Sequence, residues 1–356
     1  MKVLFAPAGM RPHLIELPLR AVGIEVRTIA QRHQSLPGQL SAAGRSLLAG
    51  ALDDADVLLT DLWSRIAAFT VLALSVRRRP IAVRLRGDPW QEVQDFDAQG
   101  HANWRSHLLR QDALHRMLRR ATLVIPVSES LRKSALRHVQ LDPDRVAAIP
   151  LPVDAQRFAP VDDPDALKRE LGLDYPHLLC LVNTFQYVQK LEGTELYLPL
   201  LRELVEAHDD AAVVIAGDGP LFPEFHQRNR EVLDHPRLIL PGHLAEIEKL
   251  YQCSDAFAHL SLFDACPNVL FEAWACAKPV IVNEYEPLLE NLEPGVNGHV
   301  LPAHTERAKG LAVLERVLYD RAHGRRLGEE GRRMVTEKFS ALAIGRRFRA
   351  EFEKLL

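Results

Sequence analysis

The stretch SLFDACPNVLFEAWACAKPV, residues 261–280, contains the end of one apolar run, an acidic loop, a helical pattern and the start of another apolar run. The first run ends near Leu262, and Asp264 follows it. Pro267 stands where a helix would begin, which is the helical position that proline tolerates best. Val280 then opens the next apolar run. A strand, a helix and a second strand in so short a space are typical of an α/β protein with a parallel sheet.

The same alternation of short apolar runs and helical patterns continues along the whole chain. The near-continuous apolar character of the runs predicts parallel strands that are covered on both faces. Strands are predicted at residues 3–6, 24–29, 57–60, 81–85, 123–127, 146–149, 178–183, 212–216, 238–240, 256–262 and 280–283. Helices are predicted near residues 11–21, 39–51, 62–77, 103–120, 128–137, 194–208, 220–233, 244–252, 267–277, 306–322, 324–337 and 339–356.

A proline-rich segment, IPLPVD at residues 149–154, marks the predicted domain boundary, because prolines disfavour a continuous helix or a central strand. The charge also changes sign near it. Residues 1–160 have 22 Lys and Arg against 15 Asp and Glu, a net charge of +7, and the remainder has 22 against 32, a net −10. We therefore predict two doubly wound domains, residues 1–155 and 156–338, and a helix over residues 339–356 that packs back on the first domain.

Composition excludes several classes of protein. With 47% hydrophobic and 26% charged residues among 356, the chain is an ordinary globular protein and neither disordered nor collagen-like. Four cysteines without a C-x-x-C pair indicate neither a disulfide framework nor a zinc site, and they fit a reducing cytoplasm. The longest apolar stretch, residues 66–76, is about half a membrane span, so we expect a cytoplasmic protein that does not cross the membrane. The fifteen histidines are scattered and are interpreted as structural or surface residues.

The helix predicted at residues 267–277 suits a phosphorylated ligand. A helix N-terminus offers free N–H groups and a partial positive charge, which favour a phosphate. Asp264 precedes this end and Glu272 lies just over one turn into the helix, so two carboxylates flank it and suit the hydroxyl groups of a ribose or a sugar. In the alternative interpretation Asp264 is only a helix-start residue and Glu272 a solvated one.

With Asp264-x7-Glu272 followed by EAWACAKPV at residues 272–280, the chain resembles the glycosyltransferase family 4 group, which has the pattern E-x7-E and a following EA(M/L)A-x-G-x-P-V helix. Further segments resemble the family in the family's order, densely over residues 145–300 and weakly before. They are IPLPVDAQRFAP (149–160), QYVQKLEG (186–193), VIAGDGPL (214–221), LPGH (240–243) with LY (250–251) and SD (254–255), and EPGVNG (293–298).

The resemblance implies the GT-B fold of two facing Rossmann-like domains. It also implies retaining transfer of a sugar from a nucleotide-diphospho-sugar to an acceptor, here a glycan, a lipid-linked or a small molecule. Glu272 would hold the ribose hydroxyls, Asp264 the hydroxyls of the transferred sugar, and Lys190 the leaving diphosphate in place of a metal or other cofactor. The alternative for Lys190 is a solvated loop lysine. Further donor-binding positions implied by the family are Gly217, Gly219, Gly242, His243, Leu244, Pro267, Asn268 and Val269.

Several positions depart from the family pattern. The arginine expected before Lys190 is missing from NTFQ at residues 183–186, the first acid is the shorter Asp264, and Ala277 replaces a glycine. The N-terminal glycine-rich loop is reduced to a segment around Gly9, on the acceptor side. The missing arginine and glycine-rich loop support one alternative, a non-catalytic nucleotide-sugar-binding or scaffold protein. A sugar-nucleotide epimerase of the same fold is a second alternative.

The first domain offers three further candidates. Arg86 and Asp88 follow a predicted strand where the family has H-G, and we predict that they are catalytic residues in contact with donor or acceptor. Their alternative is a mutual surface ion pair. Ser128 follows another predicted strand and is interpreted as an acceptor-side residue or as a helix N-cap.

Basic residues gather in the first domain. They are a solvated face in one interpretation, and in the other a surface that docks at anionic lipid headgroups on the inner face of the membrane. Nucleic acid is not expected, because no recognition motif accompanies the charge and the total charge is negative. The cluster consists of Arg77, Arg78, Arg79, Arg105, Arg110, Arg116, Arg119, Arg120, Arg132, Lys133 and Arg137.

Overall fold

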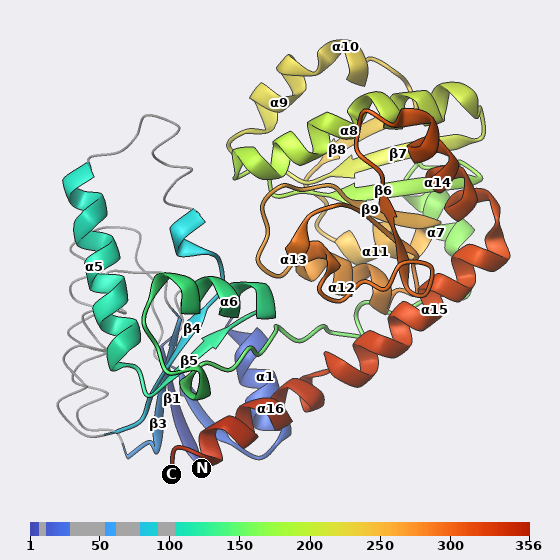
Figure 1. Cartoon of the computed structure of the whole chain (residues 1–356). Helices are drawn as coiled ribbons and strands as arrows, with labels where there is room; N and C mark the ends of the chain where they lie inside the picture. The colour runs from blue at the N-terminus through green and yellow to red at the C-terminus, as the bar shows by residue number, and fades with distance from the viewer. Residues whose placement is uncertain (7–11, 29–53, 62–78, 92–103) are drawn as a thin grey trace. The chain divides into compact units, whose positions relative to one another are not determined.

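The computed structural model describes residues 1–6, 12–28, 54–61, 79–91 and 104–356, with side chains from residue 111 onward in the last range (Figure 1). The chain folds into two compact units. Unit 1 comprises Met1–Pro152 together with Ala341–Leu356, and unit 2 comprises Val153–Ser340. No helix in the described ranges is both long and apolar enough to span a membrane.

Unit 1 is built on a parallel sheet with the strand order β2-β1-β3-β4-β5. The order reverses at β1, since the chain leaves it toward β2 on one side and later returns to β3 on the other. Its strands are β1 (Lys2–Ala6), β2 (Glu25–Thr28), β3 (Val57–Asp61), β4 (Ile81–Leu85) and β5 (Leu123–Pro126). Its helices in the described residues before the boundary are α1 (His13–Ala21), α5 (Trp104–Arg120), α6 (Glu129–His138) and the 3-10 turn η2 (Pro143–Arg145).

The C-terminal helix α16 (Ala341–Glu353) belongs to unit 1, where it runs alongside α1 (Figure 1). The two helices approach closely at Gly345, because a Cβ there would lie 2.1 Å from the carbonyl oxygen of Pro18. Phe348 and Phe352 on the same helix are fully buried. The amphipathic pattern of this segment therefore reflects packing into the first unit.

Unit 2 is built on a second parallel sheet with the order β11-β10-β9-β6-β7-β8. From β6 the chain moves outward to β7 and β8, and from β9 it moves outward in the other direction, so the order reverses between β6 and β9. Ligands of such open sheets bind outside the carboxyl ends of the strands at this reversal. The strands are β6 (His177–Val182), β7 (Ala211–Ala216), β8 (Leu238–Gly242), β9 (Ala256–His259), β10 (Val280–Asn283) and β11 (Gly298–Leu301).

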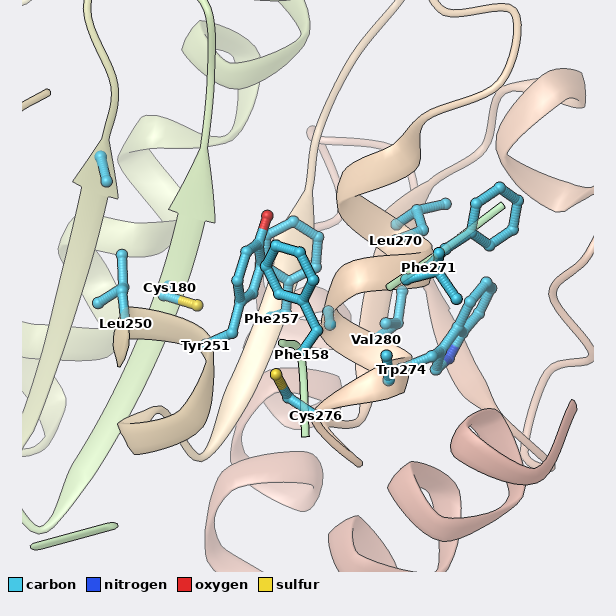
Figure 2. Close-up of a cluster of buried hydrophobic side chains, with 14 of the residues drawn as sticks. Phe158, Cys180, Leu250, Tyr251, Phe257, Leu270, Phe271, Trp274, Cys276 and Val280 are labelled. Atoms are coloured by element: carbon cyan, nitrogen blue, oxygen red, sulfur yellow. The ribbon is translucent and has the colours of Figure 1, made fainter. Parts of the chain in front are cut away.

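Helices cover both faces of this second sheet. Successive residues of β6 point to opposite faces, so Cys180 packs in the cluster with Tyr251 and Trp274, whereas Leu179 packs in the one with Leu200 and Leu314. Figure 2 shows the first of these clusters. The helices are α7 (Pro164–Glu170), α8 (Val188–Ala207), α9 (Phe222–Arg228), α10 (Arg230–Leu233), α11 (Ile247–Cys253), α12 (Asn268–Ala275), α13 (Glu286–Leu289), α14 (Arg307–Tyr319) and α15 (Arg321–Lys338).

The structure corrects some predicted elements. The strand predicted at residues 146–149 is wrong: Val146 forms only an isolated bridge with Val124, and Pro150 and Pro152 then remove two backbone donors. The strand predicted at residues 256–262 ends at His259. The helix predicted from residue 194 begins at Val188. The strand β11 and the short helices α7 and α13 were not predicted, and the helices predicted at 39–51 and 62–77 lie outside the described residues.

Candidate active site

Lys190 and Asp264 form an ion pair at the reversal point of the second sheet. β6 and β9 are adjacent strands, so the segments that follow them meet at one edge. Lys190 lies in the first turn of α8, directly after the β6 loop, and Asp264 lies on the loop after β9. The Lys190 Nζ donates to the Asp264 Oδ2 at 2.7 Å, with 20% of the lysine and 10% of the aspartate side chain exposed. The alternative of a solvated loop lysine is therefore wrong.

Three close contacts fix the start of α8 against the loop after β9. A Cβ on Gly193 would lie 2.5 Å from the Cα of Ser261, so only glycine allows this approach. The Thr194 hydroxyl donates to the Leu260 carbonyl at 3.0 Å, and the Leu262 N–H donates to the Gln189 carbonyl at 3.3 Å. The first helical turn, and with it Lys190, is thus held beside Asp264.

The loop that carries Asp264 is held from its other side by Asn283, the last residue of β10. The Asn283 side chain accepts from the Ser261 N–H at 2.8 Å and donates to the Ser261 carbonyl at 3.0 Å. The Ser261 hydroxyl donates to the Phe263 carbonyl at 2.9 Å. Asp264 itself accepts from the Cys266 N–H at 3.3 Å. The carboxylate is therefore positioned by main-chain and buried polar contacts.

Asp264 stays ionised despite its burial. Burial raises the pKa of this carboxyl, but the Lys190 ammonium and the His259 imidazole lower it by more, so the pKa lies well below the ordinary value of 3.8. At neutral pH the group is an acceptor of hydrogen bonds only. It is therefore suited to bind the donor groups of a ligand.

Glu272 lies in the second turn of α12, which begins after Pro267. At the start of a helix the first N–H groups, here those of Asn268 and Val269, have no acceptor within the helix. The Tyr251 hydroxyl donates to the Glu272 Oε2 at 3.1 Å. Burial and the charge of Glu272 raise the pKa of Tyr251 well above its ordinary value, so the phenol stays a donor.

Tyr251 is anchored by its ring. In Figure 2 the ring lies among those of Phe158 and Phe257, at centroid distances of 5.8 and 5.3 Å, and the hydroxyl oxygen stands at the end of this group. No part of Tyr251 is exposed. The aromatic cluster therefore fixes the position of the Tyr251 hydroxyl that donates to Glu272.

The predicted donor-site glycines also lie at the carboxyl edge of this sheet, where two of them serve close backbone packing. A Cβ on Gly217 would lie 1.7 Å from the Asn183 carbonyl oxygen, and one on Gly219 would lie 2.2 Å from that of Thr184. Gly242 has a φ of 75° and open space on its Cβ side. His243 is exposed and Leu244 partly buried on the loop that follows β8.

The candidates of unit 1 have separate partners. The Asp88 Oδ1 accepts from the Trp90 N–H at 3.0 Å and its Oδ2 from the Ser134 hydroxyl at 2.5 Å, whereas the Arg86 guanidinium lies 3.9 Å from Asp61. The alternative of a mutual Arg86–Asp88 pair is not what the structure forms. Ser128 caps α6, with its hydroxyl accepting from the Leu131 N–H at 3.1 Å, which confirms its N-cap interpretation. Gly9 lies outside the described residues.

The described residues contain no group of three or more His, Cys, Asp and Glu side chains that could hold a metal ion.

Two family models match the two halves of the chain. The model described as Glycosyltransferase Family 4 matches residues 3–157, and the model described as Glycosyl transferases group 1 matches residues 168–334. The chain belongs to the family 4 glycosyltransferases. The second match contains Lys190, Asp264 and Glu272.

Solved structures of similar fold extend over the whole of this chain. Anabaena HepE in complex with UDP has a TM-score of 0.78 at 17% sequence identity and covers 99% of this chain and 100% of its own. Sucrose-phosphate synthase from Thermosynechococcus elongatus has a TM-score of 0.78 at 16% identity and covers 100% of this chain and 99% of its own. The two parallel-sheet α/β units are those of the GT-B fold.

Curated relatives match over a shorter range. The GPI3 subunit of phosphatidylinositol N-acetylglucosaminyltransferase from Saccharomyces cerevisiae (strain YJM789) is 26% identical over 163 residues. These residues are 45% of this chain and 35% of that protein, so the chain spans about a third of this relative's length.

Two residues of the candidate site were not predicted from the sequence. Tyr251 lies inside a quoted family segment, but its contact with Glu272 spans 21 residues of sequence and depends on the packing of α11 near α12. His259 was grouped with the scattered histidines. Its signal was its place in the strand predicted at residues 256–262, which leads directly to Asp264. In the structure this strand ends at His259, and the imidazole Nε2 lies 3.4 Å from the Asp264 Oδ2.

Proposed function

We propose that the protein is a retaining glycosyltransferase that moves a sugar from a nucleotide-diphospho-sugar to an acceptor hydroxyl without a metal. The observation that carries this proposal is the Lys190–Asp264 pair at the reversal point of the second sheet, just ahead of the N-terminus of α12. The likeness to HepE, of which structures with UDP and with UDP-glucose are known, supports a nucleotide sugar as the donor.

Each part of the donor has a suitable group in unit 2. The diphosphate would accept from the N–H groups at the start of α12, where the helix dipole favours negative charge. The Lys190 ammonium has three donors, so it can contact a phosphate oxygen while one N–H stays on Asp264. Glu272, held by Tyr251, would accept from the ribose hydroxyls, and Asp264 from the hydroxyls of the sugar.

The reaction breaks the bond between the anomeric carbon and the oxygen of the distal phosphate. The electron pair leaves with the nucleoside diphosphate, and Lys190 and the α12 N–H groups stabilise the charge that develops there. The acceptor oxygen bonds to the anomeric carbon on the face that the diphosphate leaves. Its proton passes to the departing phosphate oxygen. The products are a glycoside of unchanged anomeric configuration and the nucleoside diphosphate.

We also propose that the basic surface of unit 1 docks the protein on anionic membranes, where a lipid-linked acceptor would lie. Its exposed described members are Arg116, Arg119 and Arg120 on α5 and Lys133 and Arg137 on α6. Each basic residue near such a surface adds about 1 kcal/mol of attraction. The side chains of Arg77, Arg78, Arg105 and Arg110 lie outside the described residues. Sedimentation with phosphatidylserine vesicles, weakened by salt, is expected, and equal sedimentation with phosphatidylcholine vesicles would contradict it.

Product analysis tests the transfer reaction. The full-length protein is incubated with labelled UDP-glucose, UDP-N-acetylglucosamine, GDP-mannose or ADP-glucose, with and without a pool of glycan and lipid-extract acceptors. We expect one donor to give nucleoside diphosphate and a labelled α-glycoside only when acceptor is present. An epimerised sugar without acceptor would indicate the epimerase instead. Tight donor binding with no product from any acceptor would favour the binding protein.

A further inference from the structure

His259 has a buried nitrogen without a hydrogen-bond partner. It ends β9, only 7% of it is exposed, and its Nε2 forms no hydrogen bond within the described part of the chain. The atom lies 3.4 Å from the Asp264 Oδ2 and misses hydrogen-bond geometry. A buried polar group without a hydrogen bond destabilises a fold. A ligand group that forms a hydrogen bond with the His259 Nε2 would remove this destabilisation.

The two polar residues that hold the loop before Asp264 differ from His259 in this respect. Asn283, on the neighbouring strand and 2% exposed, has both ends of its amide satisfied by the Ser261 backbone. Ser261, 1% exposed, is satisfied as well through the Phe263 carbonyl. The buried polar groups that only hold the loop are therefore fully bonded. His259 lies at the same edge of the sheet and differs from them by facing the carboxylate proposed to bind the sugar.

The two facing atoms define the chemistry of the missing partner. The ionised Asp264 only accepts, and an imidazole that carries its proton on Nε2 donates. A hydroxyl group does both, so one hydroxyl can donate to Asp264 and accept from His259. A phosphate oxygen would be repelled by the carboxylate, and an ether oxygen has no proton for it. The pair is therefore complementary to a sugar hydroxyl.

We propose that His259 and Asp264 together bind one hydroxyl of the donor sugar, which makes His259 a specificity-determining residue for a sugar hydroxylated at that position. This inference rests on the proposed function and deepens it by naming the group that the site recognises. Lys190 donates to the same Asp264 Oδ2 at 2.7 Å, and its two other N–H groups are left to contact the diphosphate.

The test compares free nucleotides with their sugar conjugates by titration calorimetry on the full-length protein. The probe pairs are UDP with UDP-glucose, GDP with GDP-mannose and ADP with ADP-glucose, and the pair that binds the wild type is used. His259→Leu removes the donor, His259→Asn keeps a polar group that stops short of the Nε2 position, and His259→Gln places an N–H near it. We expect Leu and Asn to weaken conjugate binding about tenfold with the free nucleotide unchanged within twofold, and Gln to restore most of it.

A second measurement uses monodeoxy analogues of the conjugate. One analogue, which lacks the recognised hydroxyl, should bind the wild type about tenfold more weakly than the parent conjugate does. His259→Asn should bind this analogue and the parent conjugate with equal affinity. Equal losses for nucleotide and conjugate in the variants, or no loss in either, would overturn the inference while leaving the proposed function intact. Failure of the wild type to bind any of the three nucleotides overturns the proposed function, and the inference with it. His259→Asn keeps the test decisive should His259→Leu fail to fold.

Discussion

Each unit of the molecule pairs one aspartate with one cation near the carboxyl ends of its strands, and the two pairs differ in what can reach them. In unit 1 Asp61 and Arg84 are register partners on β3 and β4, joined at 3.0 Å with side chains 4% and 1% exposed. In unit 2 Asp264 and Lys190 lie beyond the strand ends and are 10% and 20% exposed. A pair inside the sheet holds strands together, whereas a pair beyond the strand ends can share its groups with a ligand.

The cations suit these different tasks. The guanidinium of Arg84 is always charged and rigid, which suits a sealed contact between strands. The ammonium of Lys190 is compact and has three rotatable donors, so it can hold Asp264 and a phosphate oxygen together. The comparison thus predicts loss of stability from changes in the first pair and loss of activity from changes in the second.

The largest effect is expected for Arg84→Met. The variant keeps the apolar part of the side chain but removes the guanidinium that pairs with the buried Asp61 carboxylate. The free energy of unfolding should therefore fall by about 3–5 kcal/mol. Chemical denaturation followed by circular dichroism measures it. Arg20→Met, a surface position on α1 with 61% of its side chain exposed, is the control and should change stability by less than about 0.5 kcal/mol. A loss below about 1 kcal/mol for Arg84→Met would break the comparison.

Lys190→Ala should reduce kcat about 10²- to 10³-fold, because it removes the charge proposed to stabilise the leaving diphosphate. Steady-state release of nucleoside diphosphate measures the effect. Lys249→Ala is the matched control in the same unit, since Lys249 pairs with Glu170 and Glu246 on the surface of α11, and its kcat should stay within twofold. A Lys190→Ala enzyme with at least a fifth of the wild-type kcat would contradict the assignment.

Asp264→Asn should reveal the low pKa of the buried carboxyl through stability. The folded pKa lies below the unfolded value of 3.8, so the carboxylate stabilises the fold above that value, and the contribution is lost as pH falls below it. At each pH between 8 and 5, the free energy of unfolding of the variant should be about 2 kcal/mol lower than that of the wild type. Below pH 4 the difference from wild type should shrink. A difference that instead grows on acidification would show that the pKa is raised.

Tyr251→Phe is expected to have the smallest effect. It removes the hydroxyl that holds Glu272, so the Kd for the nucleoside diphosphate should rise about 3- to 10-fold with little change in fold. Tyr197→Phe is the matched control, because the Tyr197 hydroxyl donates to the Pro302 carbonyl at 2.9 Å and touches neither Glu272 nor Asp264. Equal Kd values for the two variants would remove Tyr251 from the account of the site.

Strands and helices with strong apolar patterns were predictable from the sequence. Residues 81–85 and 280–283 form β4 and β10 with the predicted bounds, because both runs are buried on two faces. The run at 146–149 is apolar as well, yet it pairs only through one bridge before the prolines. The helix α8 begins six residues earlier than predicted, because residues 187–193 pack onto the loop after β9. This contact joins segments that are distant in sequence, so no local pattern contains it.

The residues of the candidate site were likewise predictable only in part. Spacing and family resemblance selected Lys190, Asp264 and Glu272, and the structure brings the first two into contact across 74 residues of sequence. Ala277, noted as a departure from a glycine, indeed adopts the left-handed φ of 56° that favours glycine. The catalytic role of Asp88 stays a prediction, and its oxygens accept from the Trp90 N–H and the Ser134 hydroxyl. Such assignments depend on where a side chain points, which the sequence does not contain.

Nucleotide binding by wild type and Glu272→Gln tests the central claim, that unit 2 binds a nucleotide sugar at the reversal point of its sheet. Thermal shifts are recorded with UDP, GDP, ADP and TDP sugars, with Glu315→Gln on α14 as the control, since Glu315 contacts His208 away from α12. At 100 times its Kd a ligand should stabilise the protein by about 2.7 kcal/mol. We predict a shift with one base, kept in Glu315→Gln and lost in Glu272→Gln. No shift with any sugar nucleotide, or an equal shift in both variants, would contradict the claim.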